Sequence, residues 1–129
     1  MNVGERFATA LLARDWEGVK AILDPAVEFR GLTPGRLWEA KSADDAVHQV
    51  FSQWYECSDD AYEVLDISTG QVADRQRVVY RYRLRDSDGD YVAEQTAYFD
   101  ADAGRITKLR ILCSGPVPSG GHVLKPGAP

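Results

Sequence analysis

Three residues with chemically useful side chains, Tyr80, Tyr82 and Gln95, are spaced so that they share one face of a predicted β-hairpin. The segment Asp86-Ser87-Asp88-Gly89 has the composition of a tight turn. If this turn joins two regular antiparallel strands, Tyr80 lies opposite Gln95 and Tyr82 lies opposite Ala93. Hydroxyl and amide groups of this kind can orient or polarise an oxygen atom of a small molecule.

Alternation along the hairpin predicts which of its faces is turned inward. The face that carries the two tyrosines also carries apolar residues, namely Val78, Leu84, Ala97 and Phe99. The other face carries charged residues, with Glu94 opposite Arg81 and further arginines at positions 77 and 83. We therefore expect an inward face that mixes apolar bulk with two hydroxyls and one amide. The alternative is that Tyr80 and Tyr82 only reach the rim of the interior.

The segment before this hairpin has helical patterning. Residues 3–23 predict two consecutive helices, because apolar residues recur at helical spacing and Asp15 can cap the second helix. The proline of Asp24-Pro25 ends that helix. A third helix opens at Ser42, and its predicted buried stripe consists of Val47, Val50, Phe51 and Trp54.

Alternating patterns predict strands at residues 26–30, 62–68, 77–85, 91–100 and 105–114. Helices followed by an antiparallel run are typical of an α+β fold. We expect three N-terminal helices packed on a strongly curved, mostly antiparallel sheet, with a hollow between the two layers. This domain would span residues 1–114, and the Gly- and Pro-rich residues 115–129 would form a loose tail.

Three stretches carry a resemblance to a known family: residues 7–19, the entry to the first strand at residues 24–29, and the start of the third helix at residues 43–47. They resemble the NTF2-like/SnoaL-like superfamily, which includes ketosteroid isomerases, polyketide cyclases and limonene epoxide hydrolases. The resemblance implies a cone-shaped α+β domain with a pocket. Because one fold carries many chemistries, the reaction has to be argued from the site.

The resemblance also permits a test of the isomerase chemistry. The family's donor tyrosine, catalytic base and donor acid correspond to Phe7, Arg30 and Gln95 in this sequence. Phenylalanine cannot donate a hydrogen bond and arginine cannot abstract a proton, so we do not expect classical ketosteroid isomerase activity. The Asp–Arg–Asp set of the epoxide hydrolases is not evident either. We expect Arg30, Tyr80 and Gln95 to be the candidate catalytic residues that orient an oxygenated ring system, including an anionic one. The alternative is that Arg30 pairs with a glutamate.

The predicted pocket lining consists of apolar and aromatic residues with these polar groups among them. The candidate ligand-binding residues are Phe7, Leu11, Trp38, Phe51, Trp54 and Tyr82. The resulting hypothesis is a small-molecule-binding domain. If it is an enzyme, it would be a cofactor-independent lyase, isomerase, cyclase, dehydratase or hydrolase. The alternatives are a non-catalytic dimeric accessory module and a structural domain whose interior is filled by its own side chains.

Composition excludes several other classes. The chain has 129 residues and a net charge of −5, so we expect it to bind neither nucleic acid nor a membrane surface. The start of the chain has no basic segment followed by an apolar one, so we expect a cytoplasmic protein. With His48, His122 and two distant cysteines, Cys57 and Cys113, we expect no metal site and no cofactor.

The last predicted strand is apolar on both faces, with Leu109 and Ile111 on one side and Ile106 and Leu112 on the other. A sheet with two apolar faces needs cover on both of them. We therefore predict a homodimer through the outer face of the sheet.

Overall fold

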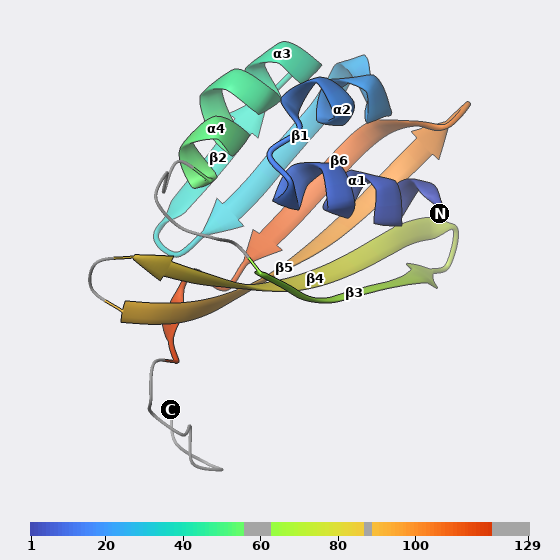
Figure 1. The fold of residues 1–129 in the computed structure, drawn as a ribbon. Helices are drawn as coiled ribbons and strands as arrows, with labels where there is room; N and C mark the ends of the chain where they lie inside the picture. Colours follow the sequence, from blue (N-terminus) through green and yellow to red (C-terminus); the bar gives the residue numbers. More distant parts are fainter. Residues whose placement is uncertain (56–62, 87–88, 120–129) are drawn as a thin grey trace.

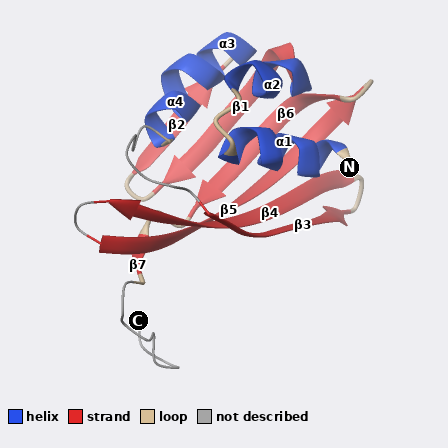
Figure 2. Cartoon of the chain, viewed as in Figure 1, coloured by secondary structure: helices blue, strands red, loops and turns tan. Residues whose placement is uncertain are grey.

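The computed structural model describes residues 1–55, 63–86 and 89–119 of the chain. Helical elements lie together over one face of a large twisted sheet (Figures 1 and 2). They are α1 (Val3–Leu12), α2 (Trp16–Ile22), α3 (Ala43–Asp45), the π-helical η1 (Ala46–Phe51) and α4 (Ser52–Trp54). The strands are β1 (Leu23–Thr33), β2 (Arg36–Ala40), β3 (Glu63–Val72), β4 (Arg75–Asp86), β5 (Gly89–Asp102), β6 (Arg105–Cys113) and β7 (Val117–Pro118). The predicted α+β class, with helices packed on a curved sheet, is confirmed.

Side-chain caps fix where the helices begin. Asn2 accepts a hydrogen bond from the Glu5 backbone N–H, and the Glu5 side chain accepts one from the Asn2 N–H, which completes a capping box at α1. Asp15 accepts from the Gly18 N–H at the start of α2, as the sequence predicted. Ser42 accepts from the Asp45 N–H and opens the third helical run. That run, α3–η1–α4, is continuous because its three elements adjoin.

The sheet has the strand order β2-β1-β6-β5-β4-β3, with β7 beside β5. The pairs are antiparallel except β1 with β6, which run parallel. Strand β2 was not predicted, and it pairs back on β1 after the turn at Pro34 and Gly35. The expectation of a loose tail is wrong for Val117 and Pro118, since Val117 pairs with Val92 and Pro118 with Tyr91. Residues 120–129, including His122, lie outside the described residues, as do Cys57 and Tyr62.

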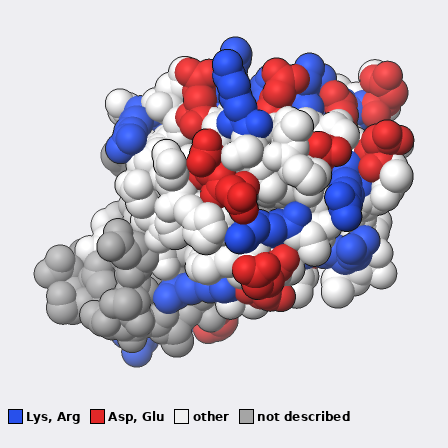
Figure 3. All heavy atoms as spheres, turned by 90° about the horizontal axis from the view of Figure 1, so that it is seen from above, with Lys and Arg blue, Asp and Glu red and all other residues white. Residues whose placement is uncertain are grey.

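The register of β4 against β5 is the predicted one, because Tyr80 lies opposite Gln95, Tyr82 opposite Ala93 and Val78 opposite Ala97. These six side chains are all buried between the sheet and the helices. Opposite them, on the outer face, the Arg81 guanidinium lies 2.9 Å from the Glu94 carboxylate. The helical side of the surface carries interspersed positive and negative side chains (Figure 3).

Gly31 of β1 allows the helices to approach the sheet closely. A Cβ atom at this position would lie 2.6 Å from Trp54 Cη2 and 2.7 Å from Phe29 Cζ. Both atoms belong to aromatic rings that pack on each other, with their centroids 5.8 Å apart. The absence of a side chain at position 31 therefore makes room for the Trp54 ring.

We expect Gly31→Ala to lower the free energy of unfolding by about 1–3 kcal/mol, the usual cost of overpacking a core. Chemical denaturation of the purified variant measures this change. Gly70→Ala is the matched control: its Cβ would meet the tip of the flexible Arg77 side chain at 2.8 Å, and that tip can move aside. Equal stability of Gly31→Ala and wild type would contradict the packing described here.

Candidate functional site

An apolar cleft of about 320 Å³ opens at one end of the space between helices and sheet. Its walls come from the β1–β2 turn, α4, the inner faces of β4, β5 and β6, and the segment after β6. The residues of the apolar cleft are Thr33, Pro34, Trp54, Tyr82, Leu84, Gln95, Cys113, Gly115 and Pro116. Its volume is near the lower end of the range of about 300–1,000 Å³ that is typical of small-molecule sites.

A hydrogen-bonded cluster lies at the inner end of this cleft, around the amide of Gln95, which is 1% exposed. The Tyr80 hydroxyl donates to Gln95 Oε1 over 2.7 Å, and the Tyr55 hydroxyl donates to the same oxygen over 2.9 Å. Gln95 Nε2 donates to Cys113 Sγ over 3.3 Å, and the Gly115 N–H donates to the same sulfur over 3.3 Å. Side chains from α4's C-cap, β4, β5 and β6 therefore meet at one buried amide.

Burial raises the pKa of Tyr55 and of Tyr80 well above the ordinary value of 10.0 for tyrosine. Loss of solvation is the main cause, and repulsion from the neighbouring Tyr82 adds to it. Both phenols thus stay protonated at any ordinary pH. They remain hydrogen-bond donors to Gln95 and cannot act as bases.

Among the predicted catalytic residues, the structure brings Tyr80 and Gln95 together but places Arg30 elsewhere. Val27, Phe29 and Gly31 of β1 point inward, so Arg30 points to the outer face, where its side chain is 60% exposed. Its Nε atom lies 3.4 Å from the Glu39 carboxylate. The prediction that Arg30 joins the inner pocket is therefore wrong in position, and the alternative of a glutamate pair is confirmed.

Phe7, Leu11 and Phe51, which were predicted to line a pocket, are fully buried in the core. The ring of Phe7 packs edge-on against Phe51 with centroids 6.1 Å apart, and against Tyr80 at 6.5 Å. These side chains fill the space under the helices. The apolar cleft lies at the end where Trp54 and Tyr82, two of the other predicted residues, line it.

The predicted pocket residue Trp38 supports the cleft from behind. Its Nε1 donates to Thr33 Oγ1 over 2.8 Å, and the Arg36 guanidinium lies 3.5 Å from its ring centroid. The ring meets Trp54 edge-on at 6.0 Å. Trp54 Nε1 is itself buried, and it has no hydrogen-bond partner within residues 1–55, 63–86 and 89–119. Trp38 thus holds both Thr33 and Trp54 in the cleft wall.

Sequence reasoning missed Tyr55 and Cys113. Tyr55 lies four residues after Phe51, which is the helical spacing of the buried stripe and the signal that would have revealed it. Cys113 lies two residues after the inward-facing Ile111 and is paired with Gln95 in the sheet. Extending the alternation of β6 by one step would have placed its thiol beside the amide.

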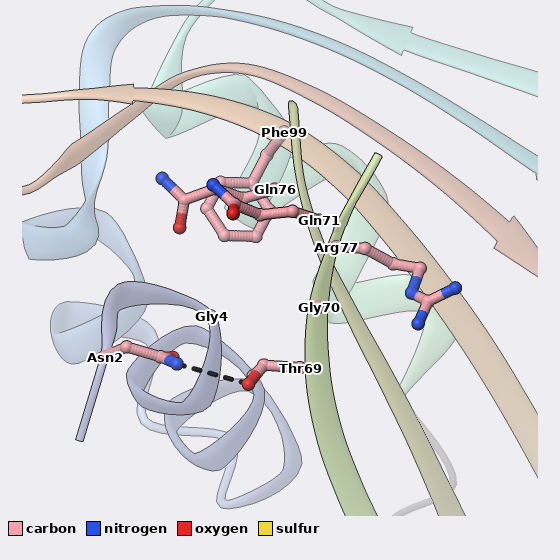
Figure 4. A pocket seen from close by; sticks show the side chains of 8 residues that line it. All are labelled: Asn2, Gly4, Thr69, Gly70, Gln71, Gln76, Arg77 and Phe99. Carbon is pink, nitrogen blue, oxygen red and sulfur yellow. Dashed lines mark hydrogen bonds between the residues drawn. The ribbon is translucent and has the colours of Figure 1, made fainter. Parts of the chain in front are cut away.

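Two further hollows lie outside the cleft. The polar hollow, about 280 Å³, lies between the start of α1 and the β3–β4 hairpin, where Asn2 Nδ2 donates to Thr69 Oγ1 over 3.3 Å (Figure 4). Gln71, Gln76 and Arg77 of the hairpin are among the residues that line it (Figure 4). The capping box already provides hydrogen-bond partners at the N-terminus of α1. We therefore interpret this hollow as a structural junction between α1 and the β3–β4 hairpin.

The outer-face hollow, also about 280 Å³, lies on the side of the sheet away from the helices, and its residues are Arg30, Gly31, Leu32, Leu37, Tyr98, Arg110, Ile111 and Leu112. His48 is exposed on the helical side. Within the described part of the chain, no three His, Cys, Asp or Glu residues form a group that could hold a metal ion. No helix in those segments is long and apolar enough to cross a membrane.

The order of elements and the large, curved, mixed sheet are those of an α+β NTF2-like fold. Residues 4–109 match the family of SnoaL-like domains. The chain therefore belongs to the SnoaL-like family. No curated protein matches it.

Solved structures with the same fold include an NTF2-like protein from Burkholderia thailandensis E264, with a TM-score of 0.66 and 19% identity over 87% of this chain and 88% of that one. A protein from Xanthomonas campestris pv. campestris, proposed to be a polyketide cyclase, has a TM-score of 0.64 and 19% identity over 85% and 86%. An LEH-like epoxide hydrolase from M. tuberculosis has a TM-score of 0.63 and 18% identity over 87% and 80%. Identities of this size show a shared fold alone.

The buried phenols predict a loss of stability at alkaline pH. Below pH 10.0 the folded and unfolded chains both keep the tyrosine protons, so the two phenols add no pH dependence. Above it the unfolded chain releases protons that Tyr55 and Tyr80 retain when folded, so stability falls as pH rises. We expect the double variant Tyr55→Phe/Tyr80→Phe to show a shallower decline, by up to about 1.4 kcal/mol per pH unit for each phenol.

Urea unfolding between pH 9 and 11 measures this slope, and Tyr98→Phe on the outer face controls for the loss of a hydroxyl. An unchanged slope in the double variant would show that the two phenols ionise equally easily in the folded and unfolded chains.

Proposed function

We propose that this protein binds a small, neutral, largely apolar molecule that carries oxygen, and that the apolar cleft is its site. The observation that carries the proposal is the Gln95 cluster: a buried amide with its partners lies at the inner end of a largely apolar opening. Ligand sites commonly combine apolar walls with a few convergent polar groups that fix orientation. A domain filled only by its own side chains would have no need for polar groups that face an opening.

The lining favours a neutral ligand. None of the described residues of the cleft carries a charge, because Arg30 and its partner Glu39 lie on the outer face. An ion that entered an apolar site without a counter-charge would lose its hydration without compensation. The anionic ligand that Arg30 suggested in the sequence is therefore not part of this proposal.

The same lining favours binding over acid–base catalysis. No carboxylate or imidazole occurs among the described residues of the cleft, and the Tyr80 hydroxyl is already engaged with Gln95. A lyase, isomerase or cyclase needs a group that moves a proton at the reacting atom. We propose a binding or accessory role first. If the protein is an enzyme, Gln95 would orient and polarise the substrate. Tyr80 would hold the Gln95 amide through its hydrogen bond.

A panel of lipids, steroids and polyketides examined by native mass spectrometry tests the proposal. We expect at least one neutral member to bind, and Trp54→Ala to weaken its binding about 10-fold or more through the loss of a cleft wall. Arg30→Ala on the outer face should bind like wild type and is the control. If ligand binding persists in Trp54→Ala and is lost in Arg30→Ala, the binding site lies on the outer face and not in the apolar cleft.

We also propose that the outer face of the sheet joins two copies of the chain. Leu37, Leu32 and Leu112 are neighbours across β2, β1 and β6, and they are 57%, 47% and 55% exposed. A contiguous row of exposed leucines is typical of an interaction surface. The prediction that Ile106 shares this face is wrong: Ile106 is fully buried in the core, and β5 has an irregularity opposite it at Asp100 and Ala101.

Sedimentation velocity at micromolar concentration tests the dimer. We expect wild type to sediment as a dimer and Leu32→Asp/Leu112→Asp as a monomer, because the two charges would be buried without partners. Val72→Asp provides the control: Val72 is 53% exposed on β3, at the opposite edge of the sheet. A monomeric wild-type protein would refute the proposed dimer and would not affect the proposed function of the cleft.

A further inference from the structure

The two tyrosines fix the direction of the Gln95 amide. An amide oxygen has two lone pairs, and here the hydroxyls of Tyr55 and Tyr80 occupy both, at 2.9 and 2.7 Å. Both phenols keep their protons, since burial raises the pKa of each well above 10.0. The oxygen of the amide is therefore committed to the protein interior, and its NH₂ group is turned the other way.

The NH₂ group has more donor capacity than the protein uses. One N–H of Gln95 donates to Cys113 Sγ over 3.3 Å, and sulfur is a weak acceptor. The second N–H has no acceptor in the parts of the chain that the structure describes. Gln95 and Cys113 both line the apolar cleft, so this is the side on which a ligand can meet the amide.

We infer that the cleft recognises its ligand through an acceptor oxygen, such as that of a ketone, which takes a hydrogen bond from Gln95 Nε2. In this arrangement Tyr55 and Tyr80 are positioning residues, since their hydroxyls stop the amide from turning over. The inference rests on the proposed function of the cleft. It narrows the proposed ligands to those that carry a hydrogen-bond acceptor.

The consequence is a preference between ligands of the same shape. A ligand that fills the cleft separates the second N–H of Gln95 from water. A ketone oxygen can accept the hydrogen bond of this N–H. An alkene of equal size leaves that donor without water and without a partner. We expect the ketone to bind about 10-fold more tightly. Removing one hydroxyl leaves the amide oxygen with a single donor, so the preference should fall in Tyr55→Phe and in Tyr80→Phe.

The probes are 2-acetylnaphthalene and 2-isopropenylnaphthalene, which differ by replacement of the carbonyl oxygen with a CH₂ group. Titration of each into wild type, with Trp fluorescence as the signal, gives the affinity ratio. The infrared stretch of ¹³C-labelled ketone reports the hydrogen bond directly and should move to lower frequency on binding. Gln95→Met, similar in size and without a donor, should bring the affinity ratio close to 1 and abolish the infrared shift.

A second measurement needs no variant in the cluster. In ¹H–¹⁵N spectra of wild type, the Gln95 side-chain NH₂ signals should move with the ketone and stay nearly in place with the alkene. Tyr98→Phe, on the outer face, should match wild type in every assay. Because the NH₂ signals are measured in wild type, the inference can be tested even if Gln95→Met does not fold.

The possible outcomes distinguish failure of the inference about Gln95 from failure of the proposed function of the apolar cleft. If neither probe binds and no member of the ligand panel binds, the proposed function fails. If both probes bind equally to wild type, the cleft is a binding site and the inference is overturned. A preference that persists in Gln95→Met overturns the assignment of the donor. An affinity ratio and infrared shift that persist in Tyr55→Phe/Tyr80→Phe overturn the positioning role.

Discussion

The pairing of β4 with β5 determines which side chains enter the interior of this protein. Side chains alternate along a strand, so a slip of one residue would send every inward residue to the outside. In the observed register Tyr80 faces Gln95 inside, and Arg81 faces Glu94 outside. A slip would bury arginines without partners and expose the aromatic core. The same alternation that packs the core therefore also delivers an amide and a hydroxyl to one buried point.

The core then limits where a ligand can lie. Phe7 and Phe51 pack against each other and fill the space beneath the helices. Gly31 lets the Trp54 ring descend onto β1, and Trp38 braces that ring from the other side. The remaining opening is at the end of the sheet, beyond Trp54, where the Gln95 amide lies at the edge of the packed interior. Packing thus makes the cleft small, and its polar side chains include the Gln95 amide and the hydroxyls of Thr33 and Tyr82.

Much of the fold followed from the sequence, because its strongest signals are local. The Asp86–Gly89 turn and the alternation after it set the hairpin register, and Asp15 and Ser42 marked helix starts that the structure confirms. Strand β2 was missed because residues 36–40 show little alternation and gain their strand geometry by pairing with β1. The family correspondence predicted an inward Arg30, but in β1 Arg30 alternates with the inward-facing residues Phe29 and Gly31 and therefore lies outside. That alternation already indicated an outward position.

The cluster around Gln95 could be predicted only in part, because two of its members come from separate parts of the chain. Tyr80 and Gln95 belong to one hairpin, so their meeting is a local consequence of register. Tyr55 follows α4, forty residues away from Gln95 in the sequence, and reaches the amide only when the helical run docks on the sheet. A second donor on the amide oxygen changes its chemistry: with one tyrosine the amide could present either end to the cleft, and with two it presents its N–H groups. The character of the site therefore depends on helix docking as well as on the hairpin, which explains why the hairpin pattern alone suggested a polar pocket without indicating what kind of group it would bind.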